Sequence, residues 1–172
     1  MALRHFFLIL LVVSLWAFNN VAIKWGLLDL PPLFMICMRF VVVALLLIPF
    51  TRVTREQLRY LLPLSFTFGF LHFSLLFVGI KYTDAGTGAI VVQLGTPFAM
   101  LLAMLILKEK LTLIQVLGIA ISLSGVVVLT GSPTIPSWWV LCLLLISAAG
   151  WAVSNMIVKK SPPIKPLTMT GW

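Results

Sequence analysis

The chain has 172 residues, of which 62% are hydrophobic and only 9% are charged, and its mean hydropathy is +1.17. Soluble domains carry about 25% charged residues, so this composition excludes a soluble globular domain and predicts an all-α, polytopic membrane protein. The net charge of +8 is compatible with nucleic-acid binding. However, the basic residues are scattered in short gaps between apolar runs, so we expect a lipid bilayer as partner and no nucleic acid.

The residues that usually carry catalysis or bind metals are sparse. Cys37 and Cys142 both lie within apolar runs without His or acidic company, so neither a disulfide framework nor a metal site is expected. The few carboxylates fall in turns, and no phosphate-binding loop or nucleophile–base pair occurs. We therefore expect no enzyme, no catalytic residue and no cofactor.

In chain order, the apolar runs predict about six complete transmembrane helices, each near the roughly 20 residues that cross a bilayer. They are expected at about 6–28, 32–50, 61–80, 85–107, 113–130 and 138–158, with a seventh helix starting near Pro166. Arg4 and His5 precede the first run, which is too long and polar for a cleaved signal peptide, so we expect an uncleaved helix.

Local signals support some of these boundaries. Asp84 is a plausible N-cap for the fourth helix, and Thr112 with Gln115 has capping-box spacing at the start of the fifth. Small residues allow close helix packing in lipid. We therefore predict that three small residues of the fifth helix face a neighbouring helix: Gly118, Ser122 and Gly125.

An internal repeat organises the chain. Residues 16–24 and 151–159 carry Trp, Ala, Asn and Lys at the same positions, 135 residues apart. In a helix, the Trp, Asn and Lys follow an i, i+4, i+8 ladder on one stripe. The repeat predicts one five-helix unit over residues 1–135 and the start of a second unit over residues 136–172, in which the chain is expected to stop early.

The positive-inside rule predicts the orientation. With a cytoplasmic N-terminus, nine basic residues lie inside, two (Lys24 and Lys81) lie outside, and Arg39 lies within a span. Five helices per unit is an odd number, so the second unit enters the membrane from the opposite side. Inverted repeats are common in secondary transporters, whose substrate sites lie at the repeat interface near mid-depth.

Polar or aromatic residues inside the spans are the candidate pathway residues. They are Trp16, Asn20, Lys24, His72, Gln93, Trp151 and Asn155. Each also has a structural interpretation. The indoles could pack between helices, the asparagines could bridge helices, and Lys24 could reach the headgroups. His72 could be a neutral cross-helix partner, and Gln93 could satisfy backbone freed by Pro97. Arg39 is expected to have a structural role, paired with Asp84 or with helix-end carbonyls.

The ordered motifs resemble the EamA family of the drug/metabolite transporter superfamily, and most closely its bacterial amino-acid metabolite efflux members. The resemblance rests on the Trp-Ala-x-x-Asn-x-x-x-Lys segment, Pro31-Pro32-Leu33 before Arg39-Phe40, Tyr82-Thr83, Pro97, and Lys108-Glu109-Lys110-Leu111-Thr112 before Gln115 and Gly118. Lys108 departs from the family, in which a small residue more often precedes the Glu-basic pair.

The resemblance implies ten helices in two inverted five-helix units, both termini cytoplasmic, and export of small metabolites across the bacterial inner membrane. The expected partners are lipid and a small-molecule substrate. The alternative function is a truncated membrane protein that does not transport, and that is inert or active only when paired with another chain, either a second copy or the missing C-terminal half.

Overall fold

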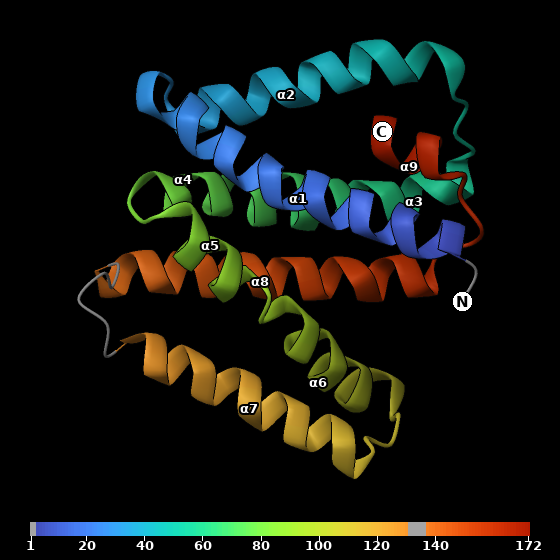
Figure 1. The fold of residues 1–172 in the computed structure, drawn as a ribbon. Helices are drawn as coiled ribbons and strands as arrows, with labels where there is room; N and C mark the ends of the chain where they lie inside the picture. The colour runs from blue at the N-terminus through green and yellow to red at the C-terminus, as the bar shows by residue number, and fades with distance from the viewer. Residues whose placement is uncertain (1–2, 131–136) are drawn as a thin grey trace.

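A computed structural model describes residues 3–130 and 137–172, and these two ranges contain helices and no strand (Figure 1). The predicted turn at 131–136 and the predicted unit boundary lie outside the described residues. The helices are α1 (Leu3–Asp29), α2 (Pro32–Leu47), η1 (Ile48–Phe50), α3 (Arg55–Leu64), η2 (Ser65–Ser74), α4 (Leu75–Lys81), α5 (Ala85–Val92), α6 (Gly95–Leu107), α7 (Leu113–Thr130), α8 (Trp138–Lys160) and α9 (Pro166–Gly171).

The helices form a polytopic membrane bundle. Five stretches are long and apolar enough to cross a bilayer: Leu3–Asp29, Pro32–Phe50, Arg55–Lys81, Ala85–Leu107 and Trp138–Lys160. The apolar α7 is shorter in its described part. Successive spans run in alternating directions, so α1 and α8 are antiparallel (Figure 1). The predicted helical membrane fold is confirmed.

Side-chain caps determine several helix starts. Asp84 caps α5 as predicted, accepting a 2.8 Å hydrogen bond from the N–H of Thr87. The predicted box at Thr112 and Gln115 also forms, with bonds of 3.4 and 2.8 Å. A second capping box, Thr54 with Gln57, starts α3 at Arg55, six residues before the predicted start. Its T-x-x-Q spacing was present in the sequence.

The third span departs from a regular helix. Residues Ser65–Ser74 are π-helical between α3 and α4. Two side-chain hydroxyl groups donate hydrogen bonds to backbone carbonyls at its start. Ser65 Oγ donates to Leu61 O at 2.8 Å, and Thr67 Oγ1 donates to Pro63 O at 2.9 Å. Short π-helical segments occur frequently at functional sites, and this one ends two residues beyond His72.

The fourth span is broken, so the continuous helix predicted over 85–107 is wrong in its middle. Pro97 has no N–H to reach the carbonyl of Gln93, and the N–H of Thr96 donates to that carbonyl instead, at 3.1 Å. The N–H groups of Gln93 and Leu94 donate three residues back, also at 3.1 Å. The backbone around the turn is thereby satisfied without the Gln93 side chain.

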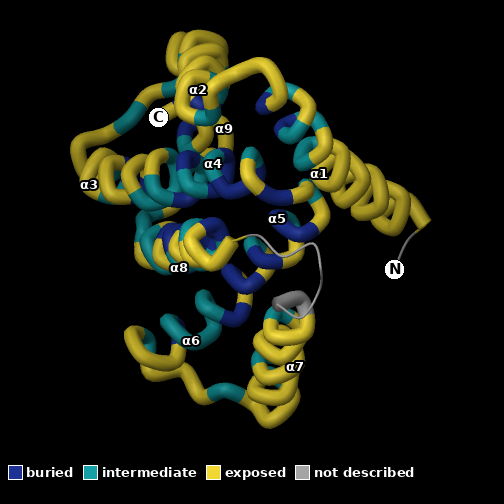
Figure 2. Tube along the Cα trace, turned by 90° about the vertical axis from the view of Figure 1, so that its left-hand side faces the viewer, coloured by how far each residue is buried: buried dark blue, intermediate teal, exposed yellow. Residues whose placement is uncertain are grey.

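Helix α8 is the centre of the bundle. It packs against α3, η2, α4, α5 and α6, and its middle is buried while the outer faces of α1, α2 and α7 are exposed (Figure 2). At one crossing, a Cβ on Gly79 of α4 would lie 2.5 Å from Leu144 Cδ2, so only glycine permits this approach. The surrounding core consists of Ile23, Leu27, Ile36, Leu76, Phe77, Ile80, Val91, Val140 and Leu144.

Helix α7 corrects one prediction. Gly118, Ser122 and Gly125 are exposed, and a Cβ on either glycine would meet nothing within 4 Å. The helix makes few contacts, with α5 and α6, so the small residues do not face another helix of the described chain.

Candidate functional site

A cavity of about 260 Å³ opens between α1, η2, α5 and α8. Five of the seven candidate pathway residues line it together: Trp16, Asn20, His72, Gln93 and Trp151. The remaining wall is largely apolar or aromatic, and consists of Val13, Ala17, Asn19, Phe68, Phe73, Leu76, Ala89 and Val92. Residues far apart in the sequence therefore form one hollow, with aromatic walls and a small number of polar groups.

The two asparagines of the repeated segment make the same hydrogen bond. Asn20 Nδ2 donates to Trp16 O at 3.0 Å, and Asn155 Nδ2 donates to Trp151 O at 2.9 Å. Each bond runs four residues back along its own helix, and neither amide has another hydrogen bond among the described residues. Each side chain therefore keeps its Oδ1 as a free acceptor.

His72 lines the cavity and is also bonded across helices. Its Nδ1 lies 2.9 Å from Ser147 O and 3.0 Å from Ser147 Oγ, while that hydroxyl donates to His72 O at 2.8 Å. Because the hydroxyl proton is used on the carbonyl, both Ser147 oxygens accept at Nδ1, and this network assigns the proton to Nδ1. Nε2 is then the ring nitrogen free to accept in the neutral imidazole.

Aromatic rings hold the imidazole from the other side. His72 stacks on Phe68, with ring centroids 5.4 Å apart and an interplanar angle of 10°, and meets the edge of Phe73 at 4.9 Å. The imidazole is 4% exposed. Sequence reasoning identified His72 but missed Ser147, because one serine in an apolar run 75 residues away carries no distinguishing signal.

Lys24 lies outside the cavity. Its ammonium group donates to three carbonyl oxygens at the end of α4, those of Ile80 (2.9 Å), Lys81 (3.1 Å) and Thr83 (2.6 Å). A cation at this position satisfies carbonyls that have no partner within the helix and offsets the negative end of the helix dipole. The contacts describe a cap for α4.

The expected pairing of Arg39 is wrong. Its guanidinium lies 5.4 Å from the centre of the Phe73 ring, a cation–π arrangement. Asp84 instead uses its carboxylate to cap α5. Arg39 has no ion pair or hydrogen bond with any described residue. The ring that it contacts also lines the cavity on its other side.

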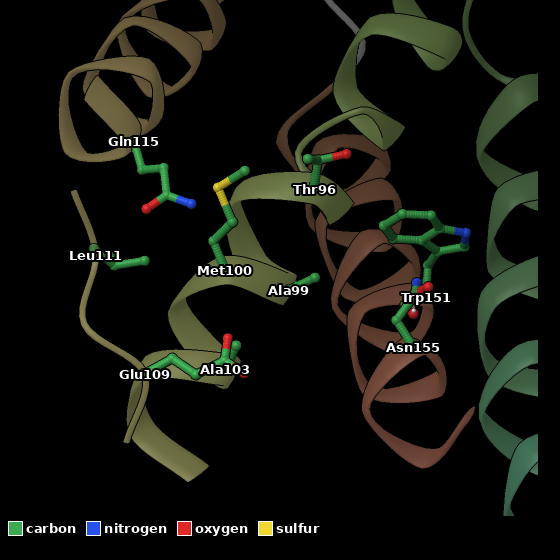
Figure 3. Close-up of a pocket in the computed structure, with 9 residues that line it drawn as sticks. All are labelled: Thr96, Ala99, Met100, Ala103, Glu109, Leu111, Gln115, Trp151 and Asn155. Carbon is green, nitrogen blue, oxygen red and sulfur yellow. Dashed lines mark hydrogen bonds between the residues drawn. The ribbon is translucent and has the colours of Figure 1, made fainter. Parts of the chain in front are cut away.

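Asn155 lies in a second hollow of about 240 Å³, between α6, α7 and α8 (Figure 3). Trp151 lines this hollow as well as the cavity. Glu109 borders it and forms an ion pair with Lys159. The other lining residues are Thr96, Ala99, Met100, Ala103, Leu111 and Gln115. The structure thus separates Asn155 from the four other candidate residues of the cavity, whereas Trp151 lines both hollows.

No group of three or more His, Cys, Asp or Glu side chains suited to a metal occurs in the described ranges. Cys37 and Cys142 are both free and exposed.

The described helices form an apolar antiparallel bundle around a hollow lined with a few polar groups, which is the architecture of a polytopic membrane protein. Residues 3–131 match the EamA-like transporter family, and the chain belongs to that family. No solved structure matches it significantly.

Relatives agree with this assignment. The chain is 35% identical to a "Probable amino-acid metabolite efflux pump" of Salmonella typhimurium, across 100% of this chain and 60% of that protein. It is 34% identical to a protein of the same description in Escherichia coli, across 95% of this chain and 56% of that protein. An uncharacterized transporter of Bacillus subtilis is 25% identical, across 95% of this chain and 60% of its own length. The chain therefore spans about three-fifths of the length of these relatives.

Proposed function

We propose that the chain exports small metabolites, amino acids or related compounds, across the bacterial inner membrane, and that the cavity binds the substrate. The observation that carries the proposal is the convergence of Trp16, Asn20, His72, Gln93 and Trp151 on one hollow. Polar groups inside a span are costly unless they have partners or serve a pathway. The family supports transport, and two relatives named as probable amino-acid metabolite efflux pumps support this class of cargo.

The groups of the cavity suit a small polar cargo, because the amides of Asn19 and Gln93 can both donate and accept hydrogen bonds. Asn20 Oδ1 and His72 Nε2 are acceptors, and the rings of Trp16 and Trp151 offer apolar faces that also attract cations. A volume of about 260 Å³ lies below the roughly 300–1,000 Å³ of drug-sized sites. An amino acid or similar small amine fits this chemistry.

We further propose alternating access between two inverted units, residues 1–135 and the start of a second at 136–172. The identical asparagine bonds in the antiparallel helices α1 and α8 support this arrangement. In the proposed orientation the N-terminus is cytoplasmic, so α1 runs outward and α8 runs inward.

The test is export from cells that produce matched amounts of each variant, using a panel of amino acids and related metabolites. We expect Asn20→Ala and His72→Ala to reduce export of the active compounds at least tenfold. Leu15→Ala is the control, because Leu15 lies on the same helix, is exposed and does not line the cavity. Wild-type export by both cavity variants would refute this binding site.

A second candidate is a chain that exports only when another chain packs against it. The exposed small-residue face of α7 and the coverage of three-fifths of the relatives support this candidate. Export that requires co-production of the remaining part of the Salmonella relative would favour it. Equal export by the chain alone would exclude it.

A further inference from the structure

We propose that Trp151 is the partition between two successive stations of the transport path, and that the hollow between α6, α7 and α8, here called the inner groove, is the second station. This inference rests on the proposed function, and it assigns a role to a hollow that the cavity does not explain. Among the described residues, Trp151 is the one that lines both the cavity and the inner groove.

The two hollows lie in series along the same helices. On the fourth span, Ala89 and Gln93 of the first half line the cavity, whereas Thr96 and Ala103 of the second half line the inner groove. From Gln93 to Ala103 a helix advances about 15 Å. On α8, Asn155 lies one turn beyond Trp151. Along the fourth span the cavity residues therefore precede the groove residues, and along α8 Trp151, which lines both hollows, precedes Asn155, which lines the groove.

The indole is seated on the break in the fourth span. A Cβ on Gly95 would lie 2.6 Å from Trp151 Cε3 and 3.3 Å from Cδ2, so the ring rests directly on the first turn of α6. Ala148 O, one turn earlier on α8, lies 3.3 Å from the same point. Only glycine at position 95 leaves room for the ring, and the partition is therefore built jointly by α6 and α8.

The inner groove offers hydrogen-bonding groups of the kind found in the cavity. Asn155 keeps a free Oδ1, and the hydroxyl of Thr96 has no partner among the described residues (Figure 3). Gln115 uses its Oε1 in the cap of α7 and keeps its amide N–H groups free. The Glu109–Lys159 ion pair borders the groove. The groove therefore suits the same small amines and amino acids, and in the proposed orientation it lies on the cytoplasmic side.

The test measures accessibility and needs no knowledge of the substrate. In a Cys37→Ser, Cys142→Ser background, single cysteines are placed at Ala89 in the cavity and Ala99 in the groove. A membrane-impermeant thiol reagent is applied to right-side-out and inside-out vesicles. We expect Ala89→Cys to react from the outside and Ala99→Cys from the inside, each at least tenfold faster than from the opposite face.

Removing the partition should abolish this sidedness. Adding Trp151→Ala should raise the slow reaction rate of each cysteine at least tenfold. Trp138→Ala is the control and should leave that rate unchanged, because Trp138 is an exposed residue of the same helix that lines neither hollow. Gly95→Ala tests the contact between Gly95 and the Trp151 ring independently. Its Cβ should displace the ring without removing it, so we expect the same rise in the slow reaction rate of each cysteine. Size-exclusion profiles identify variants that fail to fold.

The outcomes separate the two claims. Unchanged rates in folded Trp151→Ala and Gly95→Ala chains, or an Ala99→Cys that reacts from neither face, would overturn the partition. Labelling of each cysteine from one face in the parent chain and from both faces in Trp151→Ala would support the partition. Absence of export or of protection by any amino acid or metabolite would instead refute the proposed function, and with it the description of the groove as a substrate station.

Discussion

Lys24 Nζ donates a 2.6 Å hydrogen bond to the carbonyl oxygen of Thr83, which joins α1 to the turn that follows α4. A reciprocal contact runs from Lys81 Nζ to Leu30 O, at 3.4 Å. Helices α1 and α4 run parallel (Figure 1), so the negative ends of their dipoles lie together, and each helix end receives a lysine from the other helix. The two lysines that oppose the positive-inside pattern thus have structural partners.

We expect Lys24→Met to destabilise the bundle by about 1.5–3 kcal/mol, the range for hydrogen bonds made by a charged group. The measurement is the thermal unfolding midpoint in detergent. Lys160→Met is the control, because Lys160 is exposed and its side chain makes no hydrogen bond or ion pair with the described residues. Equal midpoints for the two variants would show that the three carbonyl contacts add no stability.

The Asp84 cap should give a pH-dependent contribution. Partial burial raises the pKa of Asp84, but hydrogen bonds led by those from Thr87 outweigh it and leave the pKa below its ordinary value. A depressed pKa stabilises the fold above the unfolded-state value, near 3.9, and the contribution disappears as pH falls through the folded-state value.

Accordingly, Asp84→Ala should cost about 1 kcal/mol, a typical value for loss of an N-cap, between pH 5 and 8. The difference from wild type should shrink below about pH 4. Unfolding midpoints measured across this range provide the check. Asp84→Asn keeps a capping oxygen without the titration, so a difference between wild type and Asn that persists unchanged at low pH would contradict this account.

Lys108 is strained at the end of α6. Its φ of 54° and ψ of 30° lie in the left-handed region, the single case among described non-glycine residues. This conformation costs an L-residue about 1–2 kcal/mol, whereas glycine adopts it freely. The small residue expected here from the family pattern fits the same geometry.

Lys108→Gly should therefore raise the unfolding midpoint in detergent, by the equivalent of up to about 1 kcal/mol after the greater chain entropy of glycine is included. Lys110→Gly, two residues later and without a positive φ, should not. A lower midpoint for Lys108→Gly would show that its side chain contributes more than its backbone costs.

Thiol labelling tests the proposed orientation. In a background without Cys37 and Cys142, we expect Ser137→Cys, just before α8, to react with an impermeant reagent from outside intact cells. Glu56→Cys, in the first turn of α3, should react only after the cells are opened. Both positions are exposed. The reverse pattern would place the N-terminus outside.

The sequence predicted the spans and two of the caps because those features depend on local chemistry. The length of an apolar run indicates a span. Asp84 and Thr112 each indicate a helix start, because each accepts a hydrogen bond from the backbone N–H three residues later. The break at Gln93 was also within reach, because Pro97 removes a backbone donor at a fixed distance. In contrast, no local pattern marks the π-helical stretch from Ser65 to Ser74.

Most members of the candidate site were predicted from the sequence, whereas the positions of Lys24 and Asn155 were not. The repeat and the cost of polar groups in lipid identified Trp16, Asn20 and His72, which do meet. The partners of Lys24 are backbone carbonyls, which every residue has, so the sequence could not reveal them. Asn155 occupies the equivalent position in the repeat, but it lines the inner groove and not the cavity.

The two-residue turn at Gln93 and Leu94 connects α5 to α6 within the fourth span. Its backbone donors are already satisfied at short range, three residues back, so a change of angle there leaves no N–H or C=O stranded in lipid. After this turn, α6 and α7 lie apart from α1 and α2, and they contact the rest of the bundle largely through α8 (Figure 2). The α6–α7 hairpin is thus joined to the bundle at two places, the turn at Gln93 and Leu94 and the packing of α6 on α8 beside the indole of Trp151.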